Sequence, residues 1–206
     1  MEYQKKSYHM EAVCGSAHYQ IAAYWSRVLN KPAIKAYQAS RRGIVLTANY
    51  TAKQKGVKTG QALWQAKSAC PDLVVVPPRM ELYLQFSSML REIYGEYTDL
   101  VEPYGCDEAW LDVTGSTALK GDEKKIADEI RSRVKKELGI TVSIGISWNK
   151  IFAKLGSDYK KPDAITQFHK ENYQSIVWNL PAANLLYVGR LSLIHISEPT
   201  RPLYIS

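Results

Sequence analysis

Two long segments with helical spacing of apolar side chains constrain the fold more than any other feature of this sequence. Across residues 80–97, apolar and aromatic side chains return every three or four positions, which predicts an amphipathic helix of several turns. A second helix is predicted over residues 122–138, with acidic residues early, lysines late and Gly139 after its end. Each helix has one apolar face, so each must pack against a sheet or another helix.

Short apolar runs rich in β-branched residues surround the two long helices and predict β-strands. The predicted strands cover residues 43–47, 73–76, 109–114, 141–147 and 164–167. From the second of these onward, the order is strand, long helix, strand, strand-like loop, long helix and strand. Two helices on one face of a mixed or antiparallel sheet are a common α+β solution. We therefore expect an α+β fold with a ferredoxin-like core.

Shorter elements are marked less clearly. A short basic helix is predicted after residue 47, a second helix over residues 61–69 and a third over residues 149–157. Residues 1–40 show no clean periodicity, so neither a helix nor a strand is assigned to them.

The composition is that of a folded globular protein. Its 206 residues suffice for one large or two small domains, and 46% hydrophobic against 23% charged residues exclude a disordered chain. No apolar run approaches the ~20 residues that span a bilayer, residues 73–76 being one of the short ones, and the charged N-terminus lacks a signal-peptide core. Cys14, Cys70 and Cys106 form no CxxC pair, and the histidines lack zinc spacing. We expect a cytoplasmic protein with free thiols and no membrane partner.

Basic residues are concentrated at the front of the chain. Residues 1–71 contain 11 Lys or Arg and two acidic residues, whereas residues 72–206 contain 16 basic and 18 acidic residues. A phosphate-rich partner would select such a segment, because each neutralised phosphate releases condensed counterions. On charge alone, binding of nucleic acid or nucleotide and ordinary solubility both remain open.

The densest acidic segment, residues 102–112, enters a predicted central strand. Neighbouring side chains on a regular strand point to opposite faces, so Asp107 and Glu108 could share a ligand only at an irregular strand start. Gly105 favours such an irregularity. Adjacent carboxylates repel each other, and Mg²⁺ relieves this repulsion while taking its other ligands from water and substrate phosphates. The alternative is a solvated acidic pair at a strand edge.

A basic segment follows the strand predicted over residues 141–147. Lys150 and Lys154 lie four residues apart on one face of the next helix, whose first amides can meet an anion. Lys160 and Lys161 then follow in a loop that ends at a proline. These residues could bracket a nucleotide triphosphate or a nucleic-acid backbone. The alternative is a solvated helix face.

A third segment combines an aromatic hydroxyl and a lysine. Tyr50 and Lys53 are three residues apart after the strand predicted over residues 43–47, and Arg41 and Arg42 precede that strand. A tyrosine and a lysine on one helical face could hold phosphates. Without further context, a buried tyrosine beside a surface lysine explains the pattern equally well.

In their order along the chain and in their amino-acid sequence, these three segments resemble the Y-family DNA polymerases, most closely the bacterial DNA polymerase IV type. The resemblance covers residues 41–190, about three quarters of the chain. The strings that carry it are RRGIVLTANYTAKQKGVKTGQALWQAKSACPDLVVVPPRMELY, YTDLVEPYGCDEAWLDVTGS, ELGITVSIGISWNKIFAKLGSDYKKPDAIT and NLPAANLLYVGR. The fold implied is a palm with a small fingers subdomain.

The resemblance also implies roles for individual residues. Asp107 and Glu108 stand at the paired palm carboxylates that hold two Mg²⁺ ions, which align the primer 3′ hydroxyl with the nucleotide α-phosphate. Tyr50 and Lys53 stand at triphosphate-binding positions of the fingers. Many members have arginine in place of Lys53, so a bidentate contact would become a point charge. Lys161 matches the lysine before a proline that contacts the triphosphate.

The partners implied are primer–template DNA and deoxynucleoside triphosphates, with an open site suited to damaged templates. In this context Lys150 and Lys154 are expected to contact DNA. Full-length members usually also bind a sliding clamp, and we expect this chain to be a monomer.

Departures from the family pattern lie near both ends of the sequence. The family places a third metal-binding Asp and an aromatic steric gate on its first strand, yet no Asp precedes Asp72 in this chain. The tail resembles a translated sequencing adaptor and is set aside from fold reasoning. The organisation expected is a rearranged segment, fingers, palm, the start of a thumb and the tail, over residues 1–40, 41–77, 78–180, 181–190 and 191–206.

Three functions are compatible with these features. The first is a template-directed, error-prone translesion DNA polymerase, impaired in this chain by the missing metal carboxylate and the missing thumb contacts to phosphate. The second is a catalytically dead module that binds DNA or nucleotide. The third is a nucleotide cyclase, supported by analogy of the core alone.

Overall fold

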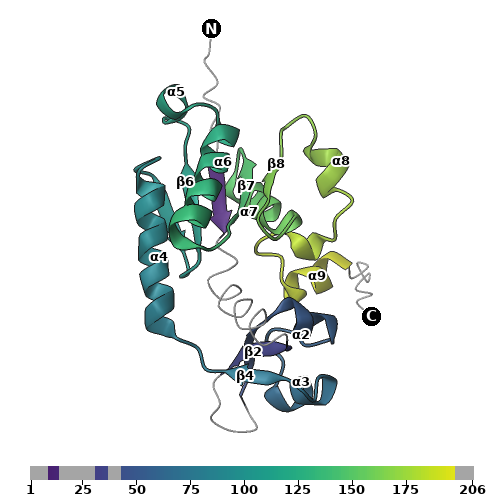
Figure 1. Ribbon diagram of the computed structural model, residues 1–206. Helices are drawn as coiled ribbons and strands as arrows, with labels where there is room; N and C mark the ends of the chain where they lie inside the picture. Colours follow the sequence, from purple (N-terminus) through teal and green to yellow (C-terminus); the bar gives the residue numbers. More distant parts are fainter. Residues whose placement is uncertain (1–8, 14–30, 37–42, 198–206) are drawn as a thin grey trace, which may run out of the picture.

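The structure is a computed structural model that describes residues 9–13, 31–36 and 43–197 (Figure 1). Within these residues it has a five-stranded sheet and a three-stranded sheet. In Figure 1 the smaller sheet lies at one end of the molecule, and the long helix α4 (Met80–Gly95) runs from it along the side of the larger sheet. The chain is therefore organised as two sheet-based units connected by α4.

The larger sheet is mixed. In order across the sheet its strands are β5 (Val101–Tyr104), β6 (Glu108–Asp112), β1 (His9–Val13), β7 (Ser143–Ser147) and β8 (Ile165–Gln167). The central strand β1 pairs antiparallel with both β6 and β7, β5 and β6 form an antiparallel hairpin, and β7 and β8 run parallel.

Two helices cover one face of this sheet. They are α4 and α6 (Glu123–Arg133), and α6 continues into a single π-helical segment, η1 (Val134–Leu138). Alternate strand residues such as Leu111, Ile144 and Ile146 point toward these helices and are almost fully buried in a common core. The predicted α+β fold, with two helices on one face of a mixed sheet, is confirmed.

A third helix, α7 (Lys150–Tyr159), packs on the opposite face. Gly145 alternates with the inward-facing isoleucines of β7, and a Cβ built on it would lie 1.8 Å from the carbonyl oxygen of Ala153 in α7. Only glycine permits the backbones of β7 and α7 to approach this closely. The residues that alternate with the core-facing isoleucines of β7, such as Gly145, therefore face α7.

The smaller unit has its own core. Its sheet has the order β3 (Val45–Ala48), β2 (Ala33–Ala36) and β4 (Val74–Val76), and two helices, α2 (Tyr50–Gln54) and α3 (Leu63–Ala69), complete it. Ten buried residues pack together within this unit, apart from the core under α4 and α6.

The remaining elements are short. They are α5 (Thr117–Lys120), α8 (Tyr173–Val177), η2 (Ala182–Asn184) and α9 (Arg190–Ser197). Helix α9 includes the first residues of the tail that sequence analysis sets aside. Among the residues that the structure describes, no helix is long and apolar enough to cross a membrane.

Sequence analysis left residues 1–40 unassigned, and the structure places two strands there, β1 and β2. Strand β1 is five residues long and β2 is four, and all four residues of β2 are buried, so β2 shows no alternation of apolar and polar side chains. The strand predicted over residues 73–76 belongs to the smaller sheet, and β1 supplies the centre of the larger one. Cys14, Arg41 and Arg42 lie outside the described residues, whereas Cys70 and Cys106 are free thiols.

Candidate active site

The two predicted metal carboxylates lie at the tip of the β5–β6 hairpin. Tyr104 and Glu108 pair across it, so Gly105, Cys106 and Asp107 form a three-residue turn. Gly105 has a φ of +73°, a left-handed conformation that favours glycine. The sequence prediction of an irregular strand start is confirmed, because Asp107 lies in the turn and Glu108 is the first residue of β6.

Glu108 points to the side of the sheet that α7 covers. Its carboxylate Oε1 lies 2.9 Å from Nζ of Lys154, and the two side chains are 21% and 12% exposed. Lys154 Nζ also lies 3.2 Å from Oδ2 of Asp158, one helical turn further along α7. The predicted DNA-binding residue Lys154 is thus half of a partly buried ion pair with a predicted metal ligand.

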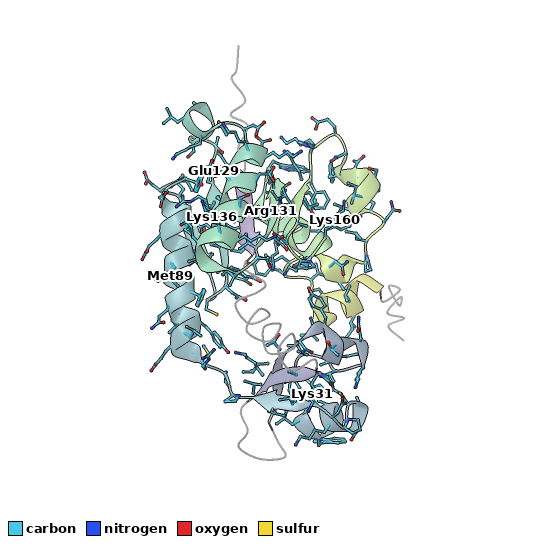
Figure 2. The ribbon with its side chains drawn as sticks, viewed as in Figure 1. Lys31, Met89, Glu129, Arg131, Lys136 and Lys160 are labelled. Carbon is cyan, nitrogen blue, oxygen red and sulfur yellow. The ribbon has the colours of Figure 1, made fainter. Side chains whose placement is uncertain are left out.

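The same chain of charges continues to Lys161. Asp158 Oδ1 lies 2.6 Å from Nζ of Lys161, so one carboxylate contacts both lysines. The loop after Lys161 is held by α6 and η1, since Arg131 of α6 donates a hydrogen bond to the carbonyl oxygen of Asp163 at 3.1 Å and Lys135 of η1 forms an ion pair with its carboxylate at 2.7 Å. Figure 2 labels Arg131 of α6 and Lys160, which begins this loop.

Lys53 of the smaller unit lies close enough to Lys161 for the two charges to interact. Partial burial lowers the pKa of Lys53 below its usual 10.5, and the nearby Lys161 ammonium lowers it further. Two like charges from different units therefore lie within electrostatic reach of each other. The two predicted triphosphate lysines therefore converge.

Tyr50, the third predicted triphosphate residue, is the first residue of α2 and is half exposed. The residue before it, Asn49, is almost fully buried. Its side-chain oxygen accepts hydrogen bonds from the backbone N–H of Ala52 at 2.8 Å and of Ala33 at 3.2 Å, and its amide donates to the carbonyl of Lys31. Asn49 therefore fixes the start of α2, and with it Tyr50, to the start of β2.

Lys150 lies on a separate patch beside the hairpin. It pairs with the carboxylate of Glu102, and its Nζ lies 5.3 Å from the centre of the Trp110 ring. The rings of Trp110 and Tyr104 are 4.7 Å apart, and Tyr104 remains 37% exposed. The second predicted DNA-binding lysine is therefore held by a carboxylate and an aromatic ring of the hairpin.

The strand next to the hairpin supplies no aspartate. Val13 is the β1 residue in register with Glu108, and Glu11, the acidic residue of β1, is in register with Trp110. Within the described parts of the chain, no group of three His, Cys, Asp or Glu side chains could hold a metal ion. Asp107 and Glu108 still fit Mg²⁺, which binds through one or two carboxylates and completes its shell with water and phosphate oxygens.

Sequence reasoning missed Asn49 and Asp158. The helical spacing of Asp158 from Lys154 and Lys161, four and three residues, was available as a signal for ion pairs. Asn49 precedes a short helix and is a residue type that commonly caps helices. Its contacts with Ala33 and Lys31, however, join residues 16 and 18 positions apart, and no local sequence pattern predicts them.

Comparison with known proteins identifies the family of this chain. A family model described as the impB/mucB/samB family matches residues 19–158. DNA polymerase IV of Acetivibrio thermocellus is 53% identical over 167 residues, which are 81% of this chain and 42% of that protein. DNA polymerase IV of Ralstonia nicotianae is 42% identical over 166 residues, which are 81% of this chain and 46% of that protein. The chain thus spans about half the length of these curated relatives.

Solved structures with the same fold are also Y-family polymerases. DinB from Sulfolobus solfataricus superposes with a TM-score of 0.79 at 26% identity, over 89% of this chain and 55% of that one. An insertion ternary complex of Dbh DNA polymerase has a TM-score of 0.74 at 27% identity, over 89% and 55% of the two chains. The chain belongs to the impB/mucB/samB family, the Y-family DNA polymerases, and its curated relatives are of the DNA polymerase IV type.

Proposed function

We propose that this chain contains the palm and fingers of a template-directed, error-prone DNA polymerase that copies damaged templates. The observation that carries the proposal is the continuous row of charges from the hairpin carboxylate Glu108 to Lys161, with Lys53 of the smaller unit beside its far end. A deoxynucleoside triphosphate would fit along this row, with its reacting α-phosphate near Glu108 and its negative β- and γ-phosphates near Lys161 and Lys53.

Each predicted residue has a place in this reaction. Lys161 and Lys53 would hold the triphosphate tail from opposite units, and the hydroxyl of Tyr50 would donate to a phosphate oxygen. Asp107 and Glu108 would hold two Mg²⁺ ions. When bound, Mg²⁺ aligns the primer 3′ hydroxyl with the α-phosphate and neutralises the charge that develops there.

The remaining parts of the proposal follow the family. Primer–template DNA would lie along the hairpin and α7, where Lys150 and Lys154 would contact its backbone. We assign residues 41–77 with β2 to the fingers, 78–180 with β1 to the palm and 181–190 to the start of a thumb. We place the protein in the cytoplasm as a monomer, with a sliding clamp as partner of the full-length polymerase.

A primer-extension assay with Mg²⁺ tests this function. We expect little turnover, because the position in register with Glu108 is Val13, and among the described residues we assign only Asp107 and Glu108 to the metal. Val13→Asp would add a carboxylate at this position of β1 and raise incorporation at least tenfold. Asp107→Asn in the same background is the control and should abolish the gain. Equal, Asp107-independent incorporation by all variants would refute the proposal.

A catalytically dead module that binds DNA or nucleotide is the second candidate. It is favoured by one observation, the valine in register with Glu108. In that case, replacing Asp107 and Glu108 by Ala would leave the Kd for primer–template DNA almost unchanged, and Val13→Asp would bring no incorporation. Measuring DNA affinity by fluorescence anisotropy beside the extension assay separates the two candidates.

A further inference from the structure

The ion pair between Lys154 and Glu108 is positioned to control the metal site. Both side chains are partly buried, and their charged atoms lie 2.9 Å apart. A carboxylate oxygen that accepts from an ammonium at this distance cannot bind a divalent cation in the same direction. A lysine beside the site also repels an incoming cation. A cation that binds Glu108 through Oε1 therefore has to displace Lys154.

A second carboxylate is available to receive Lys154. Asp158 lies one turn along α7, and its Oδ2 is 3.2 Å from Lys154 Nζ. Because the two residues are spaced i, i+4 on one helix, Lys154 can stay paired with Asp158 without any change of backbone. Asp158 also holds Lys161 at 2.6 Å, so the two lysines share one acceptor.

We propose that Lys154 is a positioning residue that competes with the divalent cation for Glu108, and that Asp158 retains Lys154 when Glu108 turns to the metal. This inference rests on the proposed function, because it takes Glu108 as a metal ligand. In the absence of metal, Lys154 stabilises the charged hairpin. In its presence, Lys154 and Asp158 form the remaining pair.

The arrangement couples the metal to the nucleotide. A triphosphate tail that draws Lys161 away from Asp158 leaves that carboxylate free to hold Lys154 more strongly. Lys154 then spends less time on Glu108, and the metal site opens. Binding of the triphosphate and of the cation is therefore positively coupled, and by linkage each increases the affinity for the other by the same factor.

Mn²⁺ binding to the whole chain without nucleotide tests the competition. The free ion is followed by its paramagnetic resonance signal. We expect Lys154→Met to lower the Kd for Mn²⁺ roughly five- to tenfold, since a competitor and a repelling charge are both removed. Lys136→Met is the matched control, because it removes the same charge from an exposed lysine of η1, on the face of the sheet opposite to α7. It should change the Kd less than twofold.

Asp158→Asn provides a second variant with the opposite expected sign. Without its second partner Lys154 stays on Glu108, so the Kd for Mn²⁺ should rise roughly two- to threefold. In the Lys154→Met background this effect should disappear, because Asp158 acts through Lys154. General loosening of α7 would shift both single variants in the same direction, and circular dichroism confirms that each variant is folded.

Glu108→Gln distinguishes failure of this inference from failure of the proposed function. If the wild-type chain binds Mn²⁺ through Glu108 and Lys154→Met leaves the Kd unchanged or raised, the competition is refuted and the polymerase site stands. If no variant binds Mn²⁺, or if Glu108→Gln binds it as well as the wild type, both are refuted. If Lys154→Met lowers the Kd for Mn²⁺ and adding Glu108→Gln abolishes this gain, the competition and the proposed polymerase site are both supported.

Discussion

At the scale of single residues, the lysines that face each other across the two units are the most informative feature. Lys53 and Lys161 come from segments more than a hundred residues apart, yet the Lys161 ammonium adds to the effect of burial in lowering the pKa of Lys53. A lysine perturbed in this way beside a second lysine is typical of a functional site, which supports the triphosphate tail proposed between them.

The lowered pKa of Lys53 predicts how nucleotide binding depends on pH. The protonated amine holds the triphosphate, and a lowered pKa means that this proton is lost at a lower pH than the 10.5 of an ordinary lysine. The Kd for a deoxynucleoside triphosphate should therefore rise as the pH increases toward 10. Lys53→Arg should remove most of this rise, because arginine stays charged. Titration calorimetry from pH 7 to 10 measures both profiles, and identical profiles would contradict the prediction.

Site residues that belong to a recognisable local motif could be predicted from the sequence. Residues whose role depends on contacts with distant parts of the chain could not. Asp107, Glu108 and Lys161 stand in dense local motifs, so they could be singled out without coordinates. The partner of Glu108 is 46 residues away, and no local pattern reports it. Whether these residues act as proposed remains a prediction for the experiments above.

At the scale of elements, the close contact of β7 and α7 determines where the site lies. Gly145 in β7 and Gly156 in α7 face each other, and a Cβ on Gly156 would lie 3.1 Å from the Gly145 Cα. The absence of side chains lets α7 lie directly on the sheet. Lys154 thereby comes within reach of Glu108 on the neighbouring part of the same face.

Gly145→Ala should therefore be severely destabilising. Its methyl group would overlap the Ala153 carbonyl and the Ser157 amide, both of which are backbone atoms that cannot rotate away. We expect a loss of at least about 2–3 kcal/mol in the free energy of unfolding. Gly95→Ala is the control, since no atom lies within 4 Å of its Cβ position and alanine favours a helix, so its effect should stay within about 1 kcal/mol. Urea denaturation compares the two, and similar midpoints would contradict the prediction.

The two helices on the other face are joined by Arg133 of α6. Its guanidinium donates to both carboxylate oxygens of Glu96, just after α4, at 2.6 and 3.0 Å, and to Glu137 at 2.8 Å. The hydrogen bonds from Arg133 hold the pKa of Glu96 below its usual 4.5. A carboxyl with a lowered pKa stabilises the fold above the pKa of the unfolded chain, and this contribution is lost as the pH falls through the folded-state pKa.

Glu96→Gln should therefore lower Tm slightly at pH 7, with a difference that shrinks below pH 4.5 and vanishes once Glu96 is protonated in both states. The bridge is exposed to solvent, so the effect is small and should weaken further in high salt. Glu92→Gln, an exposed position on α4, is the control and should leave Tm unchanged at every pH. A constant Tm difference from pH 7 to 3 would contradict this account.

Element prediction succeeded where several signals agreed. Helix α6 has an N-cap, Asp122, whose side chain accepts from the Lys125 amide at 2.7 Å, and Gly139 ends its continuation with a φ of +66°. Strand β1 has a short alternation of polar and apolar residues, from His9 to Ala12, that sequence analysis did not use. It lies in the middle of the larger sheet because β6 and β7 pair with its backbone on both sides. This pairing with distant strands has no local signal in the sequence.

At the scale of the whole molecule, the site is shared between two units with separate cores. The core under α4 and α6 and the core of the smaller sheet have no residue in common. Among the described residues, α4 connects them, and Lys35 of the smaller sheet contacts the Tyr83 hydroxyl on that helix. Separate cores allow the two units to open and close independently, and a ligand held by Lys53 and Lys161 would couple them.

Hydrogen exchange measures this independence. Val45→Ala removes two methyl groups from a fully buried position in the smaller core and should cost that unit about 2 kcal/mol. We expect faster exchange for amides of residues 43–76, while those of β6 and β7 keep their rates. Faster exchange in both sheets would show one cooperative unit instead.

Adding a deoxynucleoside triphosphate should slow hydrogen exchange in α2 and in the Lys161 loop together, because one triphosphate tail is held from both sides. Protection of only one of these two segments would place the phosphates outside the space between the units.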